Sequence, residues 1–577
     1  MLLKNTKPSQ SFLYGSSVLM ASMLAVKLIG ALFKIPLTNI LGETGMGYFG
    51  SAYNLYTAVY ALTVTGLSTA VARMTAEQAA QGRWQDVRKL FRMATGLFLL
   101  LGLAGSAIVL AAARSFAALI DSPHSFWAVV MIAPAIFFCC LMASFRGYYE
   151  GLSNMTPTAV TQVVEVVVKL AAGLVFANLA MEAARRQFRL TGLVFGVPCQ
   201  SLEAADMVAV PFGAAGAMLG VSASTLAGFL YVLLRYKLRG DAITPEQLAA
   251  APPSAGGMLP RLLRMAVPIT LGAVVLQLSA LIDTVTIQNR LIGCYEKAPA
   301  LLEELYGGFL REGEELHTFL YGCFTTCVTL FNLVPAFTGI FGKSALPNVT
   351  SAWTRSDRQR LRANVESVIR STSLVAAPLA CGLAFMAEPI LSLLYGGLPG
   401  VIHVGAPLLS LLATASLFLA LVAPANAIFQ GIGRMDLPVK YLCAGALAKL
   451  LLNLILVGIP SVNILGSALS TLACYGLIAL LTLNKLRNVL TVRLDFSGTL
   501  LKPLVCGLIC GISSLLCWNA LTKYAGNSII TLFSMAVGGV FYLISLAVFR
   551  VISPEDVFML PNGKKIAKVL EKLRLIR

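Results

Sequence analysis

Residues 125–146 read SFWAVVMIAPAIFFCCLMASFR, and no charged side chain occurs between Ser125 and Arg146. An α-helix rises about 1.5 Å per residue, so this run is long enough to cross the roughly 30 Å hydrocarbon core of a bilayer. Similar apolar runs of about 20 residues recur along the whole chain. The run therefore predicts a membrane-spanning helix, and its recurrence predicts a chain that crosses the membrane many times.

Composition supports an all-α integral membrane protein. The 577 residues are 57% hydrophobic and only 12% charged, whereas a soluble domain carries roughly 25% charged residues. Alternating segments of about 10 residues, the pattern of an outer-membrane barrel, are absent. We therefore expect about 14 transmembrane helices. The expected spans are residues 12–40, 48–72, 93–113, 125–146, 157–180, 207–234, 262–289, 317–341, 366–387, 401–429, 438–459, 463–484, 499–520 and 527–549.

The basic residues predict the orientation of these transmembrane helices in the membrane. With a cytoplasmic N-terminus, about 32 of the 44 Lys and Arg fall in cytoplasmic segments and about eight in outer ones. Both termini are therefore expected in the cytoplasm of a cell-membrane protein. The formal net charge of +18 then reflects topology, and no nucleic-acid partner is expected. Residues 181–206 and 290–316 are the longer outer loops. The basic tail, 552–577, is expected either on the anionic inner leaflet or as a solvated helix.

A repeat relates the two halves of the chain. Residues 149–155 read YEGLSNM and residues 429–435 read FQGIGRM, 280 positions later. Lys169 and Lys449 follow at the same offset, each in an apolar helix. Both loops are expected in the cytoplasm, so the repeat is parallel, as in transporters built from two related halves. This predicts six-helix lobes over residues 1–240 and 241–490, two further helices within 491–551, and the tail.

Ionisable residues inside the bilayer are costly and mark functional positions. The candidates are Lys27, Lys34, Lys169, Lys449, Glu165, Asp283 and the more interfacial Glu388. Glu165 and Lys169 are spaced i,i+4, so one alternative is that they neutralise each other. Lys34 could also reach toward the outer interface. Excess positive charge near the bilayer middle favours an anionic substrate such as a phosphate or pyrophosphate.

Several functions lack their motifs. GxxxxGK[ST] and HExxH are absent, and only three His occur. Most of the 12 Cys lie in apolar runs and no CxxC pair appears, so buried thiols are expected rather than metal ligands or disulfides. No metal, cofactor or catalytic constellation is expected. Two rivals to a transporter of anions remain, namely a multidrug/cation antiporter and an intramembrane polymerase or ligase.

The chain also resembles a known group. Residues 145–151 read FRGYYEG, and with the residues around them they resemble the stage V sporulation protein B group of the multidrug/oligosaccharidyl-lipid/polysaccharide exporter (MOP) superfamily. The positions that carry this resemblance are Lys27, Gly30, Lys34, Pro36, Leu37, Leu41, Gly42, Arg146, Met155, Pro157, Thr158, Gln162, Gly431, Gly433, Lys449 and Asn453. The group is similar to the MurJ lipid II flippases.

The resemblance implies two six-helix lobes around a central cavity and a flippase of undecaprenyl-pyrophosphate-linked sugars. The substrate would be an oligosaccharide or peptidoglycan precursor, for example in spore cortex synthesis, and cell-wall synthesis proteins are possible partners. The expected substrate-binding residues are Lys27, Lys34, Lys169 and Lys449, supported by Arg146, Glu165, Asp283 and Asn453. Nothing would be cleaved, so no enzyme activity is expected.

Overall fold

The computed structural model describes residues 12–241, 243–249, 257–311, 313–434, 436–490, 495–522, 527–549 and 551. They form two compact units, and each is described by itself. Unit 1 comprises Met1–Asn289 and Leu310–Gly322, and unit 2 comprises Arg290–Phe309 and Cys323–Arg577. Within the described ranges, 13 helical segments are long and apolar enough to cross a membrane. The chain is a multi-pass, almost entirely helical membrane protein, as predicted.

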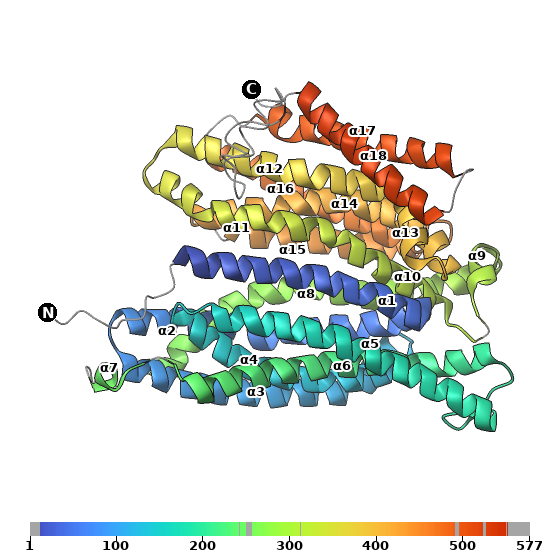
Figure 1. The fold of residues 1–577 in the computed structure, drawn as a ribbon, viewed down its shortest axis with the longest axis horizontal. Coiled ribbons are helices and arrows are strands. Elements are labelled where there is room, and N and C mark those ends of the chain that lie inside the picture. Colours follow the sequence, from blue (N-terminus) through green and yellow to red (C-terminus); the bar gives the residue numbers. More distant parts are fainter. Residues whose placement is uncertain are drawn as a thin grey trace. The chain divides into compact units, whose positions relative to one another are not determined.

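The elements of the first part of the chain are long helices joined by short turns (Figure 1). In order they are α1 (Phe12–Tyr60), η1 (Ala61–Thr65), α2 (Gly66–Ala80), α3 (Trp84–Leu119), η2 (Pro123–Ser125), α4 (Phe126–Gly151), α5 (Thr156–Thr191), β1 (Leu193–Val194), β2 (Val197–Pro198), α6 (Leu202–Arg239), α7 (Pro245–Ala249) and α8 (Met258–Lys297).

The first two predicted spans form one continuous helical segment, Ala25–Ala80, which accounts for the difference between 14 and 13. The segment is bent at Gly42, whose φ of 70° and ψ of −172° are not helical. In an unbroken helix the rise between positions 33 and 49 would be about 24 Å, yet the Phe33 and Phe49 rings lie 6.1 Å apart. The chain therefore folds back at Gly42, where glycine tolerates the positive φ.

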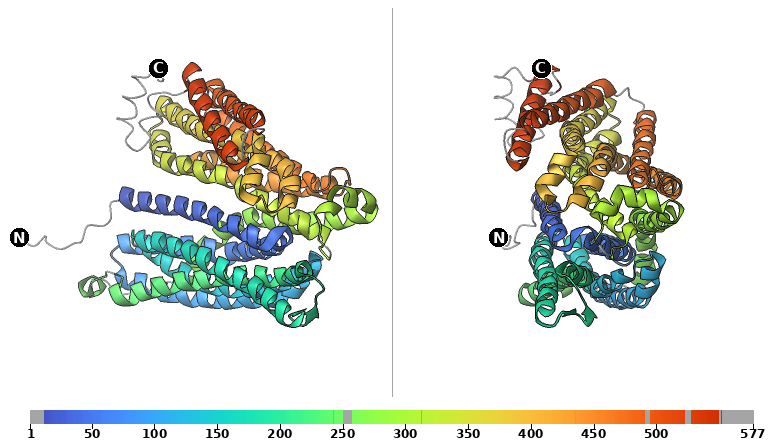
Figure 2. Two further views of the ribbon diagram at one scale, coloured as in Figure 1. Left: turned by 45° about the vertical axis from the view of Figure 1, so that its right-hand side comes forward. Right: turned by 90° about the vertical axis from the view of Figure 1, so that its right-hand side faces the viewer.

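Small residues let neighbouring helices of unit 1 approach closely. Helices α4, α5 and α6 lie side by side, and Figures 1 and 2 show them running along one another. A Cβ added to Gly220 on α6 would overlap the backbone of Gly173 on α5. Close backbone contact at small residues is how helices associate when lipid removes the hydrophobic driving force. Aromatic side chains fill the space elsewhere, as where Phe91 stacks on Tyr148 with ring centroids 4.3 Å apart.

The remaining part of the chain continues the ladder. Its elements are α9 (Pro299–Tyr306), η3 (Gly307–Phe309), α10 (Leu316–Phe331), α11 (Leu333–Thr354), α12 (Arg358–Phe385), α13 (Ala387–Tyr395), α14 (Pro399–Gly431), α15 (Asp436–Leu452), η4 (Asn453–Val457), α16 (Leu465–Leu490), η5 (Ser497–Leu501), α17 (Lys502–Leu521) and α18 (Asn527–Val548). The predicted spans from 366–387 onward each coincide with one of these segments.

The two longer outer segments, expected as loops at residues 181–206 and 290–316, are largely helical. Helix α5 runs on to Thr191, and a short hairpin of the two-residue strands β1 and β2 joins it to α6 at Leu202. In the second loop, α8 continues to Lys297 and α9 covers Pro299–Tyr306. Hydropathy ends a predicted span where the apolar run ends, but helical hydrogen bonding continues into polar residues outside the bilayer.

The 280-residue repeat is visible in the backbone. Helices α4 and α14 end at Gly151 and Gly431, and α5 and α15 begin at Thr156 and Asp436. The turn after α4 is closed by hydrogen bonds from the N–H groups of residues 152, 153 and 154 to the carbonyls of 148, 150 and 149. Residues 432, 433 and 434 bond to 428, 430 and 429 in the same way. Positive φ values also recur, 58° at Ser153 and 78° at Gly433.

Some predictions lie outside what the structure describes or tests. Met435 of the repeat and the basic tail at 552–577 are outside the described residues. The lobe boundaries near residues 240 and 490 stay a prediction, and helix α8 belongs to unit 1 as far as Asn289.

Candidate functional site

The bend of α1 places two of the predicted lysines on one aromatic ring in unit 1. The Nζ of Lys34, on the first arm of α1, lies 5.8 Å from the centroid of the Tyr53 ring on the second arm. The Nζ of Lys169, on α5, lies 5.3 Å from the same ring and 5.5 Å from that of Phe33. Both distances fall within the range of a cation–π contact. Lys34 therefore lies over Tyr53 rather than reaching outward.

Lys27 belongs to the same charged region. It is exposed and lies two turns before Lys34 on α1, and both Lys169 and Lys27 repel the Lys34 ammonium. Ser22, one turn before Lys27, donates a hydrogen bond of 3.2 Å to Gln162 on α5. Helix α5 and the first arm of α1 thus hold three lysines in one part of unit 1.

Tyr53 is a site residue that the sequence prediction missed. It is one member of a row on the second arm of α1, in which Phe49, Tyr53, Tyr56 and Tyr60 follow at i+3 or i+4 spacing. Neighbouring rings of this row lie 5.7 to 6.0 Å apart. The spacing was visible in the sequence, but an aromatic row on a transmembrane helix is usually interpreted as packing, and only the bend brings it under the lysines.

The alternative in which Glu165 neutralises Lys169 is wrong. Glu165 forms its ion pair with Arg146 on α4. Arg146 also donates from Nε to the Oγ1 of Thr161 at 2.8 Å. Arg146 and Glu165 are only 13% and 21% exposed, so the pair is largely sequestered and each charge is satisfied by the other. The carboxylate is therefore committed to α4, and Lys169 remains with the aromatic rings.

Lys449 and Asn453 lie in unit 2. Lys449, in the last turn of α15, is 6% exposed. Asn453, completely buried, begins the π-helical segment η4 and accepts a hydrogen bond from Ser470 on α16. Single π turns inside α-helices often occur at functional positions. The predicted spacing of these two residues on one helix is confirmed, whereas their role stays a prediction.

Asp283 lies beside a polar network of unit 1. It is buried on α8, next to Thr284. Asn54 on α1 donates hydrogen bonds of 3.0 Å to both Thr284 and Tyr321 on α10, and the Thr284 and Tyr321 hydroxyls are 2.8 Å apart. The network links three helices, and neutral Asn, Thr and Tyr in separate apolar runs gave no sequence signal of it.

The tyrosines of the FRGYYEG motif anchor the end of α6. The Tyr148 hydroxyl donates to the Asp241 carboxylate at 2.9 Å, and that of Tyr149 donates to the Gly240 carbonyl at 3.0 Å. Arg88 makes a two-pronged contact with Asp241 at 3.0 and 3.2 Å. Burial alone would raise the pKa of Asp241, but hydrogen bonds from Arg88, the Ile243 N–H and Tyr148 hold that pKa below its usual range.

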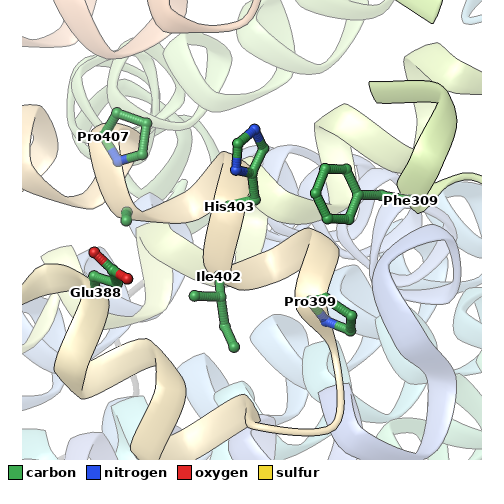
Figure 3. Close-up of a pocket in the computed structure, with 7 residues that line it drawn as sticks. Phe309, Glu388, Pro399, Ile402, His403 and Pro407 are labelled. Carbon is green, nitrogen blue, oxygen red and sulfur yellow. The ribbon is translucent and has the colours of Figure 1, made fainter. Parts of the chain in front are cut away.

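A separate pocket of about 400 Å³ lies in unit 2. The Phe309 and His403 rings stack there with centroids 4.7 Å apart, and the Glu388 carboxylate comes from the start of α13 (Figure 3). Its polar groups are exposed, so it is a surface depression, whereas Lys34 and Lys169 of unit 1 are half-buried.

The amino-acid sequence matches a known protein family and resembles two bacterial proteins along most of its length. Residues 12–341 match the model of the polysaccharide biosynthesis protein family. The chain is 22% identical to stage V sporulation protein B of Bacillus subtilis (strain 168), over 96% of this chain and 98% of that protein. It is 24% identical to the lipid II flippase MurJ of the same organism, over 82% of each.

Solved structures show the same fold. A lipid II flippase MurJ in an inward closed conformation matches with a TM-score of 0.62 at 13% identity, over 92% of this chain and 98% of that one. An inward-facing multidrug resistance MATE transporter of the MOP superfamily matches with a TM-score of 0.58 at 13% identity, over 82% and 98%. The fold class inferred from the sequence motifs is confirmed.

Proposed function

The chain belongs to the family of polysaccharide biosynthesis proteins, and on this basis we propose that it flips a lipid-linked sugar across the cell membrane. The substrate class is an undecaprenyl-pyrophosphate-linked oligosaccharide or peptidoglycan precursor. The relatives support this choice, since one of them is named a lipid II flippase and another a stage V sporulation protein. The second name supports a role in sporulation, and within sporulation we propose spore cortex synthesis.

One observation carries the proposal: two lysine ammonium groups share the Tyr53 ring. Two like charges held close together repel each other, and an anion between them removes that repulsion. Aromatic faces attract each ammonium without neutralising it. The carboxylate nearest in sequence, Glu165, is engaged by Arg146. The site therefore offers positive charge to a polyanion, and a pyrophosphate is the polyanion that a prenyl-linked sugar carries.

The three parts of the substrate would lie in three different environments. In unit 1, Lys34 and Lys169, with Lys27 next to them, would bind the pyrophosphate, and Lys449 is the residue that we propose for substrate binding in unit 2. The sugar would occupy hydrated space beside the lysines, while the prenyl chain stays in lipid. Alternating exposure of this site to the two sides of the membrane would complete the transfer. No bond is broken, so the protein would act as a transporter. Both of its termini would lie in the cytoplasm, as the distribution of Lys and Arg predicts.

The alternative is a multidrug/cation antiporter, which the MATE-like fold also permits. Binding a cation requires an available carboxylate in the same lobe. In unit 1, the candidate for this carboxylate is Glu165. Its ion pair with Arg146 disfavours cation binding by Glu165. The alternative would require the pair to open during transport.

Complementation tests the proposal in cells. Replacing Lys27 or Lys449 with Ala should abolish rescue of a strain that lacks the gene, at normal expression and with unchanged membrane abundance. Glu165→Gln serves as the comparison because an antiporter needs that carboxylate. Full rescue by the Lys27→Ala/Lys449→Ala double variant would refute the lysine site. Drug efflux by the wild type that is lost in Glu165→Gln would favour the antiporter.

A further inference from the structure

A basic face at the start of α3 takes no part in the proposed transport. Gln85, Arg88, Lys89 and Arg92 follow at i, i+3, i+4 and i+7 spacing, so they lie on one side of the helix. Together with Leu248 they line a cavity of about 540 Å³. The cavity therefore presents three cationic side chains from two successive turns.

The chain after α6 closes one side of this cavity. Gln85 donates a hydrogen bond of 2.8 Å to the Leu248 carbonyl in α7, and α7 lies beside the first turns of α3 (Figure 1). Arg88 is held by Asp241 at 3.0 Å, and Lys89 and Arg92 are exposed. Three cationic side chains therefore line the cavity, and the Arg88 contact fixes its inner wall.

The same face of α3 turns apolar as it continues. Leu99 and Leu103 lie about two and three turns beyond Arg92 on that side, and they are 40% and 53% exposed, with neighbouring Leu100 at 65%. All three belong to the membrane-spanning segment Trp84–Leu119. A molecule that binds along this face thus meets cations at one end and exposed leucines at the other.

We propose that this cavity binds the phosphate group of an anionic phospholipid, whose acyl chains lie along Leu99 and Leu103. Lys89 and Arg92 contact the phosphate, and Arg88 and Gln85 form the floor. Basic pockets beside transmembrane helices recognise lipid headgroups in this way. A soluble phosphate compound would gain nothing from the leucines. The site lies at the end of α3 that the charge distribution assigns to the cytoplasm, where anionic lipids are concentrated.

Lipid retention measured by native mass spectrometry tests the site on the full-length protein. The protein is purified in detergent and titrated with dioleoylphosphatidylglycerol, with dioleoylphosphatidylcholine as the neutral lipid. The test variant is Lys89→Gln/Arg92→Gln. The control is Lys237→Gln/Arg239→Gln, which removes two exposed cations from the last turn of α6 in the same unit. Thermal unfolding of both variants verifies that each one is folded.

The proposal predicts that the test variant binds phosphatidylglycerol about tenfold more weakly, because each Lys or Arg contributes substantially to binding of an anionic headgroup. The control should lose less than about twofold, and phosphatidylcholine should bind all proteins equally. Equal losses in both variants would mean diffuse attraction and would overturn the site. If inorganic phosphate at millimolar concentration displaced phosphatidylglycerol, the cavity would be a site for soluble phosphate, and the proposed lipid site would be refuted.

Discussion

The two repeated hairpins, α4–α5 and α14–α15, share a backbone but not their charges. Their turns have the same hydrogen bonds 280 positions apart, and Lys169 and Lys449 occupy the same place. The positions of Arg146 and Glu165, in contrast, are occupied by Asn426 and Gly445. A Cβ at Gly445 would overlap the Ile478 side chain, so in unit 2 an apolar contact fills the place of the carboxylate.

This difference distinguishes a feature that both hairpins share, the lysine, from a feature that only the first hairpin has, the Arg146–Glu165 ion pair. An ion pair between α4 and α5 is not needed to form the hairpin, because the second copy forms without it. The lysine is common to both copies although a cation inside the bilayer is costly. We infer that the lysines serve the substrate and that the Arg146–Glu165 pair serves the first hairpin itself.

The largest expected effect comes from removing the shared lysines. Lys169→Met and Lys449→Met should each weaken binding of undecaprenyl pyrophosphate by about tenfold or more, because a charge-assisted contact is lost. Binding of uncharged undecaprenol should not change. Isothermal titration in detergent gives both affinities. Unchanged pyrophosphate affinity in one variant would show that only the other hairpin binds substrate.

Removal of one member of the ion pair tests the other half of the comparison. Arg146→Ala leaves Glu165 sequestered without a partner, which should cost about 3 kcal/mol of unfolding free energy. Arg146→Gln/Glu165→Gln removes both charges, as the second hairpin does, and should recover most of this loss. Denaturation in mixed micelles measures the free energies. If the double variant were as unstable as Arg146→Ala, the pair would be essential to the first hairpin.

A smaller difference between the two hairpins lies at Tyr148 and at its counterpart Ile428. Tyr148 donates to Asp241, whereas the equivalent Ile428 has no hydroxyl. Asp241→Asn should lower stability at pH 7 by about 1 kcal/mol, a value reduced because Arg88 is partly exposed.

The pH dependence of that difference has a defined direction. The pKa of Asp241 is below its usual range in the folded protein, so its contribution is complete above the unfolded pKa of about 3.9 and lost as the pH falls through the folded pKa. Melting curves of the wild type and Asp241→Asn should therefore converge in acid. A constant gap between pH 7 and pH 3 would contradict the ionic contact.

An effect of at most the same size is expected at the turn itself. Ser153 has a φ of 58° where Gly433 has 78°, and a non-glycine residue pays for this conformation. Ser153→Gly should stabilise the protein by up to about 1 kcal/mol, and Gly433→Ala should destabilise it by about 1 kcal/mol. Opposite shifts in melting temperature are the expected readout, and shifts of the same sign would refute the equivalence of the turns.

The sequence predicted those features that follow from the bilayer or from the chain's own periodicity. Bilayer thickness limits each span, so apolar runs located the helices, and the matched motifs located the repeat. The partner of Glu165 was not predictable, because i,i+4 spacing pointed to Lys169 while the structure brings Arg146 from another helix. The break at Gly42 falls between the expected spans 12–40 and 48–72 and was therefore predicted. The place of Tyr53 beneath the lysines was not, because it depends on how side chains of the two arms and of α5 meet, which hydropathy does not describe.

Headgroup accessibility in proteoliposomes tests the central claim most directly. Vesicles containing the protein and a fluorescent undecaprenyl-pyrophosphate-linked sugar are treated with a membrane-impermeant reagent that destroys the exposed label. Wild-type vesicles should lose nearly all of the label, because lipid from the inner leaflet reaches the outside. Lys169→Met/Lys449→Met vesicles should keep the inner-leaflet share, as protein-free vesicles do. Equal loss of label in wild-type and doubly substituted vesicles would contradict the lysine-based account.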